Sequence, residues 1–166
     1  IRGVRYKKGQ RWFSSHYVLD RPTLEKDFRE LKNIGVNTIR VDDPEVYSYN
    51  LLRIAAEQGL QLIYSFRIPD TLDFREDQVA LQELREKIIK IIKRYKDQSH
   101  ISAWNLGNPV WDNLGNRFAR PALDLQRSAF LVWFEDLCDE IKNIDPQRRL
   151  FADFSISQGS EEYIQR

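Results

Sequence analysis

The chain has 166 residues, of which 42% are hydrophobic and 12% aromatic, so it can form one domain with a sizeable core. Its 26 Lys and Arg residues against 25 Asp and Glu residues give a formal net charge of +1, which excludes a global attraction to nucleic acid or an anionic membrane. No apolar run approaches the ~20 residues of a membrane-spanning helix. We therefore expect a single domain over residues 1–166, no nucleic-acid partner and no membrane insertion.

Strand and helix patterns alternate along the chain. Strands are predicted at 1–6, 36–41, 60–68, 101–106 and 150–156, and a long loop at 7–20. Helices are predicted from Thr23 to Gly35, from Pro44 to Gly59, at 76–96 and at 121–144, with a further helix beginning near 160. The chain contains no methionine and starts inside a strand pattern, so we expect it to be an excised or processed piece.

This alternation predicts right-handed βαβ units and a parallel sheet. Alternation alone does not choose between a closed barrel and an open doubly wound sheet. Two features favour the barrel: no glycine-rich phosphate turn follows a strand, and polar residues collect at the carboxyl ends of the strands. We therefore predict an α/β fold, a partial TIM-type (β/α)₈ barrel of about five parallel strands in the order 1-2-3-4-5.

Residues of opposite character alternate along the predicted strands. The face expected to line the barrel carries Thr38, Arg40, Ser65, Arg67, Trp104, Leu106, Asn108, Phe151, Asp153 and Ser155. The face expected to meet the helices carries Ile39, Val41, Leu62, Tyr64, Phe66, Ala152, Phe154 and Ile156. The sequence thus places Arg40, Arg67, Asn108 and Asp153 at one rim.

Five segments carry a resemblance to a known family. They are IRGV at 1–4, DFRELKNIGVNTIR at 27–40, AAEQGL at 55–60, WNLGN at 104–108 and IDPQR at 144–148. In this order and spacing they resemble clan A glycoside hydrolases, most of all the barrel domain of the family 2 β-glycosidases, with the yeast-type glucanosyltransferases a second likeness. The resemblance implies a carbohydrate ligand and no cofactor, and it favours an extracytoplasmic location without fixing the compartment.

The chemistry of that family needs two carboxylates. In retaining enzymes an acid at the end of strand 4 and a nucleophile at the end of strand 7 lie about 5 to 5.5 Å apart. The corresponding strand 4 motif here reads Gly107-Asn108-Pro109-Val110, so a proline, which cannot transfer a proton, stands at the acid position. The nucleophile's strand would lie beyond Arg166. The resemblance therefore implies no catalytic residues in this chain.

Arg40 and Asn108 match sugar-binding positions of the family. Arg40 corresponds to the arginine that supports the nucleophile, and the alternative is a barrel-interior arginine paired with a local acid. Asn108 corresponds to the asparagine that contacts the sugar 2-hydroxyl, and the alternative is a turn residue before Pro109. Arg67 and Asp153 join them as candidate binding residues at strand ends.

Aromatic and imidazole side chains in the loops are further candidates. His16 loosely matches a histidine that lines the family's pocket, with an exposed loop histidine as the alternative. Trp111 and Trp12 fall in predicted strand-end loops, where they could stack on a pyranose ring or pack in a core. Trp104 and Trp133 are predicted to be core residues.

Other chemistry is weakly supported by the sequence. Asp112 or Asp153 could replace the missing acid, although Asp112 also fits an ordinary turn or cap. No metal site is expected, because the two histidines, His16 and His100, lie far apart in the pattern. The lone cysteine, Cys138, excludes an internal disulfide and fits a buried small apolar residue.

Two functions follow from the sequence. One is a non-catalytic glycoside-hydrolase-like domain that binds a glycan or a protein partner at its strand ends. The alternative is a fragment of an active glycosidase or transglycosidase whose remaining strands are not in this chain. In either case the open strand edges predict self-association or pairing with missing segments of a larger protein.

Overall fold

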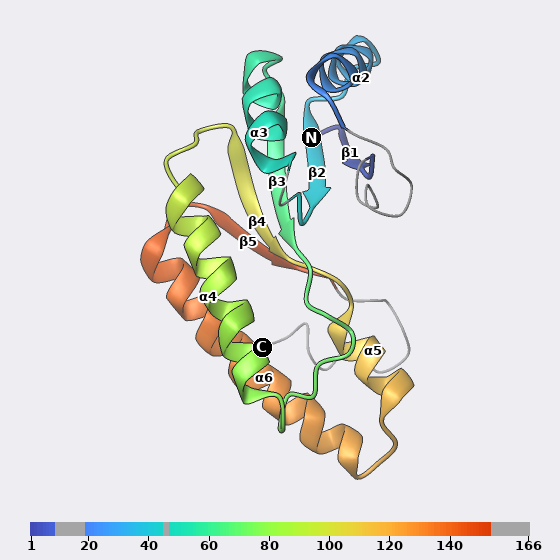
Figure 1. The fold of residues 1–166 in the computed structure, drawn as a ribbon, viewed down its shortest axis with the longest axis vertical. Helices are drawn as coiled ribbons and strands as arrows, with labels where there is room; N and C mark the ends of the chain where they lie inside the picture. The colour runs from blue at the N-terminus through green and yellow to red at the C-terminus, as the bar shows by residue number, and fades with distance from the viewer. Residues whose placement is uncertain (9–18, 45–46, 154–166) are drawn as a thin grey trace. The chain divides into compact units, whose positions relative to one another are not determined.

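The computed structural model of the chain describes residues 1–8, 19–44 and 47–153. Its strands are β1 (Gly3–Tyr6), β2 (Thr38–Asp42), β3 (Gln61–Phe66), β4 (Ile101–Leu106) and β5 (Arg149–Ala152). Its helices are α2 (Arg21–Asn33), α3 (Ser48–Glu57), α4 (Gln78–Tyr95), α5 (Val110–Arg117) and α6 (Ala122–Ile144) (Figure 1). The strands are parallel and follow the order β1-β2-β3-β4-β5, as the sequence predicts.

The chain divides into two compact units. The first unit comprises residues 1–66 and 97–105, and the second comprises 67–96 and 106–166. The expected single domain stays a prediction. Within the described residues, no helix of either unit is both long and apolar enough to cross a bilayer.

In the first unit, α2 begins one residue after an aspartate cap. The Asp20 carboxylate accepts a hydrogen bond of 3.0 Å from the backbone N–H of Thr23, which satisfies one of the free donors of the first turn. Asp20 is therefore the cap, and the helix begins two residues before the predicted start at Thr23, with Pro22 inside its first turn. The helix buries Leu24 and Phe28, and the ring of Phe28 meets Tyr6 of β1 edge-on at 5.3 Å.

The pairing of β1, β2 and β3 determines which side chains of the first unit lie together. Arg5 lies opposite Arg40, and Asp42 lies opposite Ser65. Because side chains alternate along a strand, these four share one face of the sheet. Ile39, Val41, Leu62, Tyr64 and Phe66 are all buried, as expected for the other face.

The predicted faces of β4 are wrong. The Trp104 ring lies 5.8 Å from Tyr64 and 6.0 Å from Phe66, so Trp104 belongs to the apolar face. Asn105, its neighbour, accepts a hydrogen bond from Ser65 and belongs to the polar face. The pattern misleads because Trp104 and Asn105 are both buried, so the burial of these two neighbours does not tell the two faces of β4 apart. Trp104 is nevertheless a core residue, as predicted.

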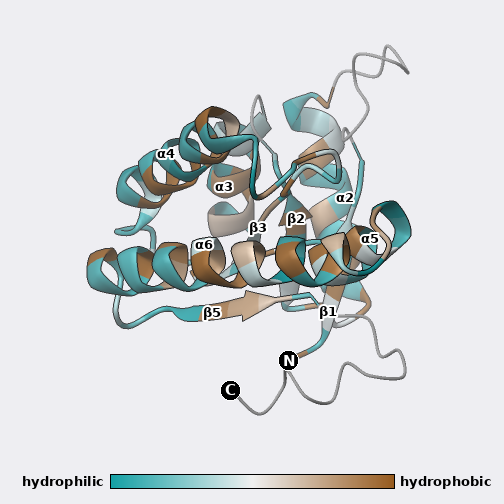
Figure 2. Ribbon diagram, turned by 90° about the horizontal axis from the view of Figure 1, so that it is seen from below, coloured by the Kyte–Doolittle hydropathy of each residue, from teal (hydrophilic) through white to brown (hydrophobic). Residues whose placement is uncertain are grey.

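The second unit is built on three helices. Both α4 and α5 contact α6, and Figure 2 shows hydrophobic and hydrophilic bands along α4 and α6. Their apolar sides enclose a core with Phe74 against Phe130 at 5.1 Å, and Trp133 packs against it. The buried residues of this core are Ile68, Leu72, Phe74, Leu81, Val110, Trp111, Leu114 and Phe130.

Helix α5 is absent from the sequence prediction, which placed a loop between β4 and residue 121. Its eight residues bury Val110, Trp111 and Leu114, whose spacing is helical, but one turn of apolar residues beside Gly115 gives little signal. The other boundaries differ by a few residues at most helix and strand ends. The predicted helix near 160 and strand residues 154–156 lie outside the described residues.

Candidate functional site

A chain of polar side chains runs across the first unit at the carboxyl ends of its strands. The Arg40 network consists of Arg5, Arg40, Asp42, Ser65 and Asn105. Nε of Arg40 donates to Oδ1 of Asp42 at 3.0 Å, and Nε of Arg5 donates to Oδ2 of the same carboxylate. Nη2 of Arg40 donates to Oγ of Ser65 at 3.1 Å, and that hydroxyl donates to Oδ1 of Asn105 at 2.8 Å.

Asp42 holds two arginines together. Register places Arg5 and Arg40 directly opposite each other on neighbouring strands, where like charges repel. Asp42 gives one carboxylate oxygen to each guanidinium group. Burial opposes ionisation of Asp42, but the hydrogen bond from Arg5 and the charges of Arg40 and Arg5 outweigh it and lower the pKa of the carboxyl.

Arg40 is thus paired with a local acid, the alternative that the sequence left open. Its side chain is 22% exposed. Asn105, at 3% exposure, is a member of this network that the sequence did not predict, because the expected alternation put its neighbours Trp104 and Leu106 on the polar face of β4. The signal that could have found it is a carboxamide inside an otherwise apolar buried strand, where it needs a hydrogen-bonding partner.

A second polar group lies in the second unit, after the strand-end residues 66 and 106. The Asp70 network consists of Arg67, Asp70, Asn108, Asn113 and Arg117. The side-chain amides of Asn108 and Asn113 each donate to Oδ1 of Asp70 at 2.6 Å. Nη1 of Arg117 donates to the backbone oxygens of Asp70 and Leu72, both at 2.9 Å.

Asn108 uses both ends of its amide inside the protein. Its Oδ1 accepts from the backbone N–H of Ile68 at 2.9 Å, while its Nδ2 donates to Asp70. This is the turn-fixing duty that the sequence offered as the alternative to sugar binding. The amide still has a second hydrogen and the oxygen a second lone pair, so a contact to a ligand stays a prediction.

The remaining predicted site residues fall in different places. Trp111 is not in a loop: it lies in α5, is 6% exposed, and has the Arg127 guanidinium carbon 4.3 Å from its ring centroid. Core packing is therefore its structural role. Arg67 is exposed and reaches Asp70 at 3.4 Å, and Asp153 is half-buried directly after β5. Trp12 and His16 lie outside the described residues.

The position after Asn108 carries no acid. Pro109 caps α5 with φ −72° and ψ 70°, and its backbone oxygen accepts from the N–H of Asn113 at 3.0 Å. Asp112 follows in the first turn of α5, a position that a carboxylate favours on helix-dipole grounds alone. Among the described residues, no group of three or more His, Cys, Asp or Glu side chains could hold a metal ion.

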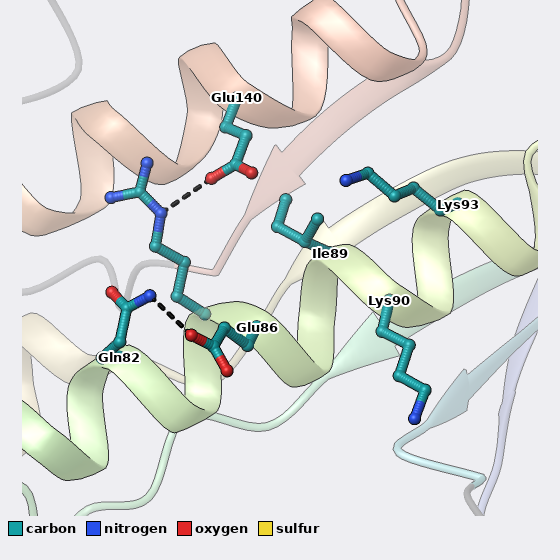
Figure 3. Close-up of a pocket in the computed structure, with 7 residues that line it drawn as sticks. Gln82, Glu86, Ile89, Lys90, Lys93 and Glu140 are labelled. Carbon is teal, nitrogen blue, oxygen red and sulfur yellow. Dashed lines mark hydrogen bonds and ion pairs between the residues drawn. The ribbon is translucent and has the colours of Figure 1, made fainter.

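A pocket of about 350 Å³ lies on the helices of the second unit (Figure 3). All its lining residues come from α4 and α6: Gln82, Arg85, Glu86, Ile89, Lys90, Lys93 and Glu140. Nε of Arg85 donates to Glu140 at 2.7 Å and Gln82 donates to Glu86 at 2.8 Å, so these polar groups satisfy one another. None of these residues belongs to a strand end, and the pocket is not the predicted site.

The fold is α/β with parallel strands that alternate with helices, as in part of a TIM-type (β/α)₈ barrel, and this agrees with the prediction. The chain is similar to the structure of Bacteroides uniformis β-glucuronidase 2 covalently bound to cyclophellitol-6-carboxylate aziridine, with a TM-score of 0.73 and 19% identity, over 87% of this chain and 17% of that one. It is also 25% identical over 115 residues to the 1,3-β-glucanosyltransferase GAS5 of Saccharomyces cerevisiae, covering 66% of this chain and 24% of that protein. No family model matches. The chain thus spans about a quarter or less of the length of these two proteins.

Proposed function

We propose that this chain is a glycoside-hydrolase-like barrel domain that binds carbohydrate at the carboxyl ends of its strands and does not cleave glycosides as it stands. The observation that carries this proposal is Pro109. It follows Asn108 directly after β4, where the barrel glycosidases that the chain resembles have their acid, and a proline side chain has no transferable proton.

The surroundings of two acids near the strand ends, Asp42 and Asp70, also support the proposal that the chain does not cleave glycosides. The Asp42 carboxylate is held by two arginines and has a lowered pKa, so it stays ionised near neutral pH and cannot serve as a general acid. Oδ1 of Asp70 is occupied by two amide donors. The polar side chains left at these positions are suited to holding a ligand rather than to transferring protons.

The test measures binding and cleavage separately. Binding is measured by calorimetry with a β-1,3-linked glucohexaose and with a β-glucuronide, the two chemistries named by the similar proteins. Cleavage is measured with 4-nitrophenyl β-glucoside and β-glucuronide. We expect saturable binding of one of the two ligands and no release of nitrophenol above the uncatalysed rate.

Matched variants sharpen the result. Pro109→Glu restores an acid and Pro109→Ala does not, and we expect both to stay inactive because the resemblance also requires a nucleophile. The absence of binding to either glycan would overturn the carbohydrate assignment. Turnover by the wild-type chain that is lost in an Asp112 or Asp153 variant would overturn the non-catalytic assignment.

The second candidate is a fragment of a glycosidase or transglycosidase. It is favoured by the coverage, since the chain matches only 17% and 24% of the two longer proteins. In that case the protein purified from its natural source would cleave or transfer glycans, whereas residues 1–166 alone would not. Lack of turnover by the natural protein would remove this candidate.

A further inference from the structure

The Asp70 carboxylate is held in place before any ligand arrives. Two amides fix Oδ1, and Arg117 fixes the backbone oxygen of the same residue. The amide of Asn108 is itself fixed by the backbone of Ile68. The Asp70 side chain nevertheless remains 44% exposed. Because hydrogen bonds within the protein already fix this exposed carboxylate, it loses little conformational entropy when it binds a ligand.

The second oxygen of this carboxylate is available. In the part of the chain that the structure describes, the contact recorded for Oδ2 is Nη2 of Arg67 at 3.4 Å, at the outer limit of a hydrogen bond. An ionised carboxylate only accepts hydrogen bonds, so its partner must donate a hydrogen. A ligand's carboxylate has no hydrogen to donate at neutral pH.

The charges around Asp70 narrow the choice of donor. The guanidinium groups of Arg67 and Arg117 both reach Asp70, and the carboxylate of Asp73 also interacts with Arg117, so positive and negative charges around Asp70 are about balanced. Such a place has no net attraction for a charged ligand. A neutral hydroxyl group fits, because it donates to the carboxylate and accepts from a guanidinium group at the same time.

We propose that Asp70 is a binding residue for adjacent hydroxyl groups of a neutral hexopyranose. Oδ2 of Asp70 accepts from one hydroxyl, and Arg67 or Arg117 donates to the oxygen of the next. This inference rests on the proposed carbohydrate-binding function and assigns it to specific atoms. It also names the ligand class as a neutral sugar end rather than an acidic one.

Asp70→Asn separates ligand binding from loop support. The asparagine keeps an oxygen that can accept from Asn108 and Asn113, while Oδ2 becomes an NH₂ group that can no longer accept. Asp136→Asn, an exposed position on α6, is the matched control. Calorimetry with neutral β-1,3-linked glucohexaose should show affinity lowered roughly tenfold or more in Asp70→Asn and unchanged in Asp136→Asn.

The thermal unfolding midpoint of Asp70→Asn should stay within about 2 °C of the wild type. Arg67→Gln is a second variant, at a residue whose side chain is 67% exposed and not part of the core, and it should lower affinity about threefold or more. If the wild type binds the sugar and both variants bind it equally well, Asp70 only ties the loops, and the proposed function stands without this inference. If the wild type binds no glycan, the proposed function and the assignment of Asp70 are both wrong.

Discussion

Asn108 and Asp70 are joined by a hydrogen bond of 2.6 Å from Nδ2 to Oδ1, which links the residues that follow β4 to those that follow β3. The backbone N–H of Ile68 closes the same link through Oδ1 of Asn108. One carboxamide therefore needs to be a donor on one side and an acceptor on the other. An asparagine satisfies both requirements, whereas an aspartate satisfies only one.

Asn108→Asp should destabilise the chain at neutral pH. The new carboxylate can still accept from Ile68, but it faces the carboxylate of Asp70 at hydrogen-bonding distance. We expect the free energy of unfolding to fall by about 1–2 kcal/mol, and by less in high salt because Asp70 is exposed.

Acidification should reverse this loss. In acid the carboxyl introduced at position 108 takes up a proton and can donate to the carboxylate of Asp70, so the variant should approach the wild type. Urea unfolding of both proteins at pH 7 and pH 3.5 measures this, with Asn108→Ala as the control that loses the link without adding charge. A deficit that is the same at both pH values would contradict the repulsion argument.

Asp42 should matter more than an exposed aspartate of the same unit. In Asp42→Asn the new NH₂ group meets a guanidinium group, and Arg5 and Arg40 face each other without a negative charge between them. We expect a loss of about 2–3 kcal/mol in the free energy of unfolding. Asp97→Asn, at an exposed loop position, should change it by less than about 0.5 kcal/mol.

The Asp42 contribution has a defined pH dependence. The pKa of Asp42 is lower in the folded chain than in the unfolded one, so its contribution is complete above the unfolded value of about 4 and is lost as the pH falls through the folded value. The difference between wild type and Asp42→Asn should therefore be constant from pH 6 to 8 and shrink below about pH 4. A difference that grows on acidification would contradict the sign of this shift.

The sequence predicted the alternation of strands and helices well, because apolar periodicity records which residues are buried. It even gave 101–106 as a strand, the bounds that β4 has. The sequence could not predict which face of the sheet each β4 residue lies on, because Trp104 and Asn105 are both buried. Only the contact of Trp104 with Tyr64 and that of Asn105 with Ser65 assign them to opposite faces.

The Asp70 network could not be read from the sequence. Asp70 and Asn113 are exposed or half-buried polar residues in segments 43 positions apart, and either alone resembles an ordinary turn or helix residue. What makes them a candidate site is the convergence of two amides on one carboxylate oxygen, which only the three-dimensional arrangement shows. Arg40, by contrast, could be picked from its family-like segment, although its partner Asp42 could not.

Cys138 should react slowly with thiol reagents. Burial on α6, together with the negative charges of Asp139 and Glu135, raises the pKa of its thiol to about 11. At pH 8 the reactive thiolate is therefore roughly a hundredfold less populated than in a free cysteine. Labelling with a chromogenic disulfide should be slow in buffer, speed up about tenfold per pH unit between pH 8 and 10, and become fast in denaturant. Labelling of the folded chain at the rate of free cysteine would contradict this.

A protein made of residues 1–166 alone should self-associate. β1 and β5 stand at the two ends of the strand order, so each has a strand neighbour on one side only among the described residues. Unpaired backbone donors and acceptors at such an edge can pair with another chain. The edges also expose apolar side chains, since Phe151 on β5 is 42% exposed and Ile1 next to β1 is 95% exposed.

Light scattering over a roughly hundredfold range of concentration should give a mass that rises above 19.8 kDa. Phe151→Lys places a charge on the β5 edge and should lower this association. Val132→Lys makes the same kind of change, from an exposed apolar residue to lysine, on α6 away from the strand edges, and it should not lower the association. A constant mass of 19.8 kDa for the wild type at every concentration would show that both edges are protected within one chain.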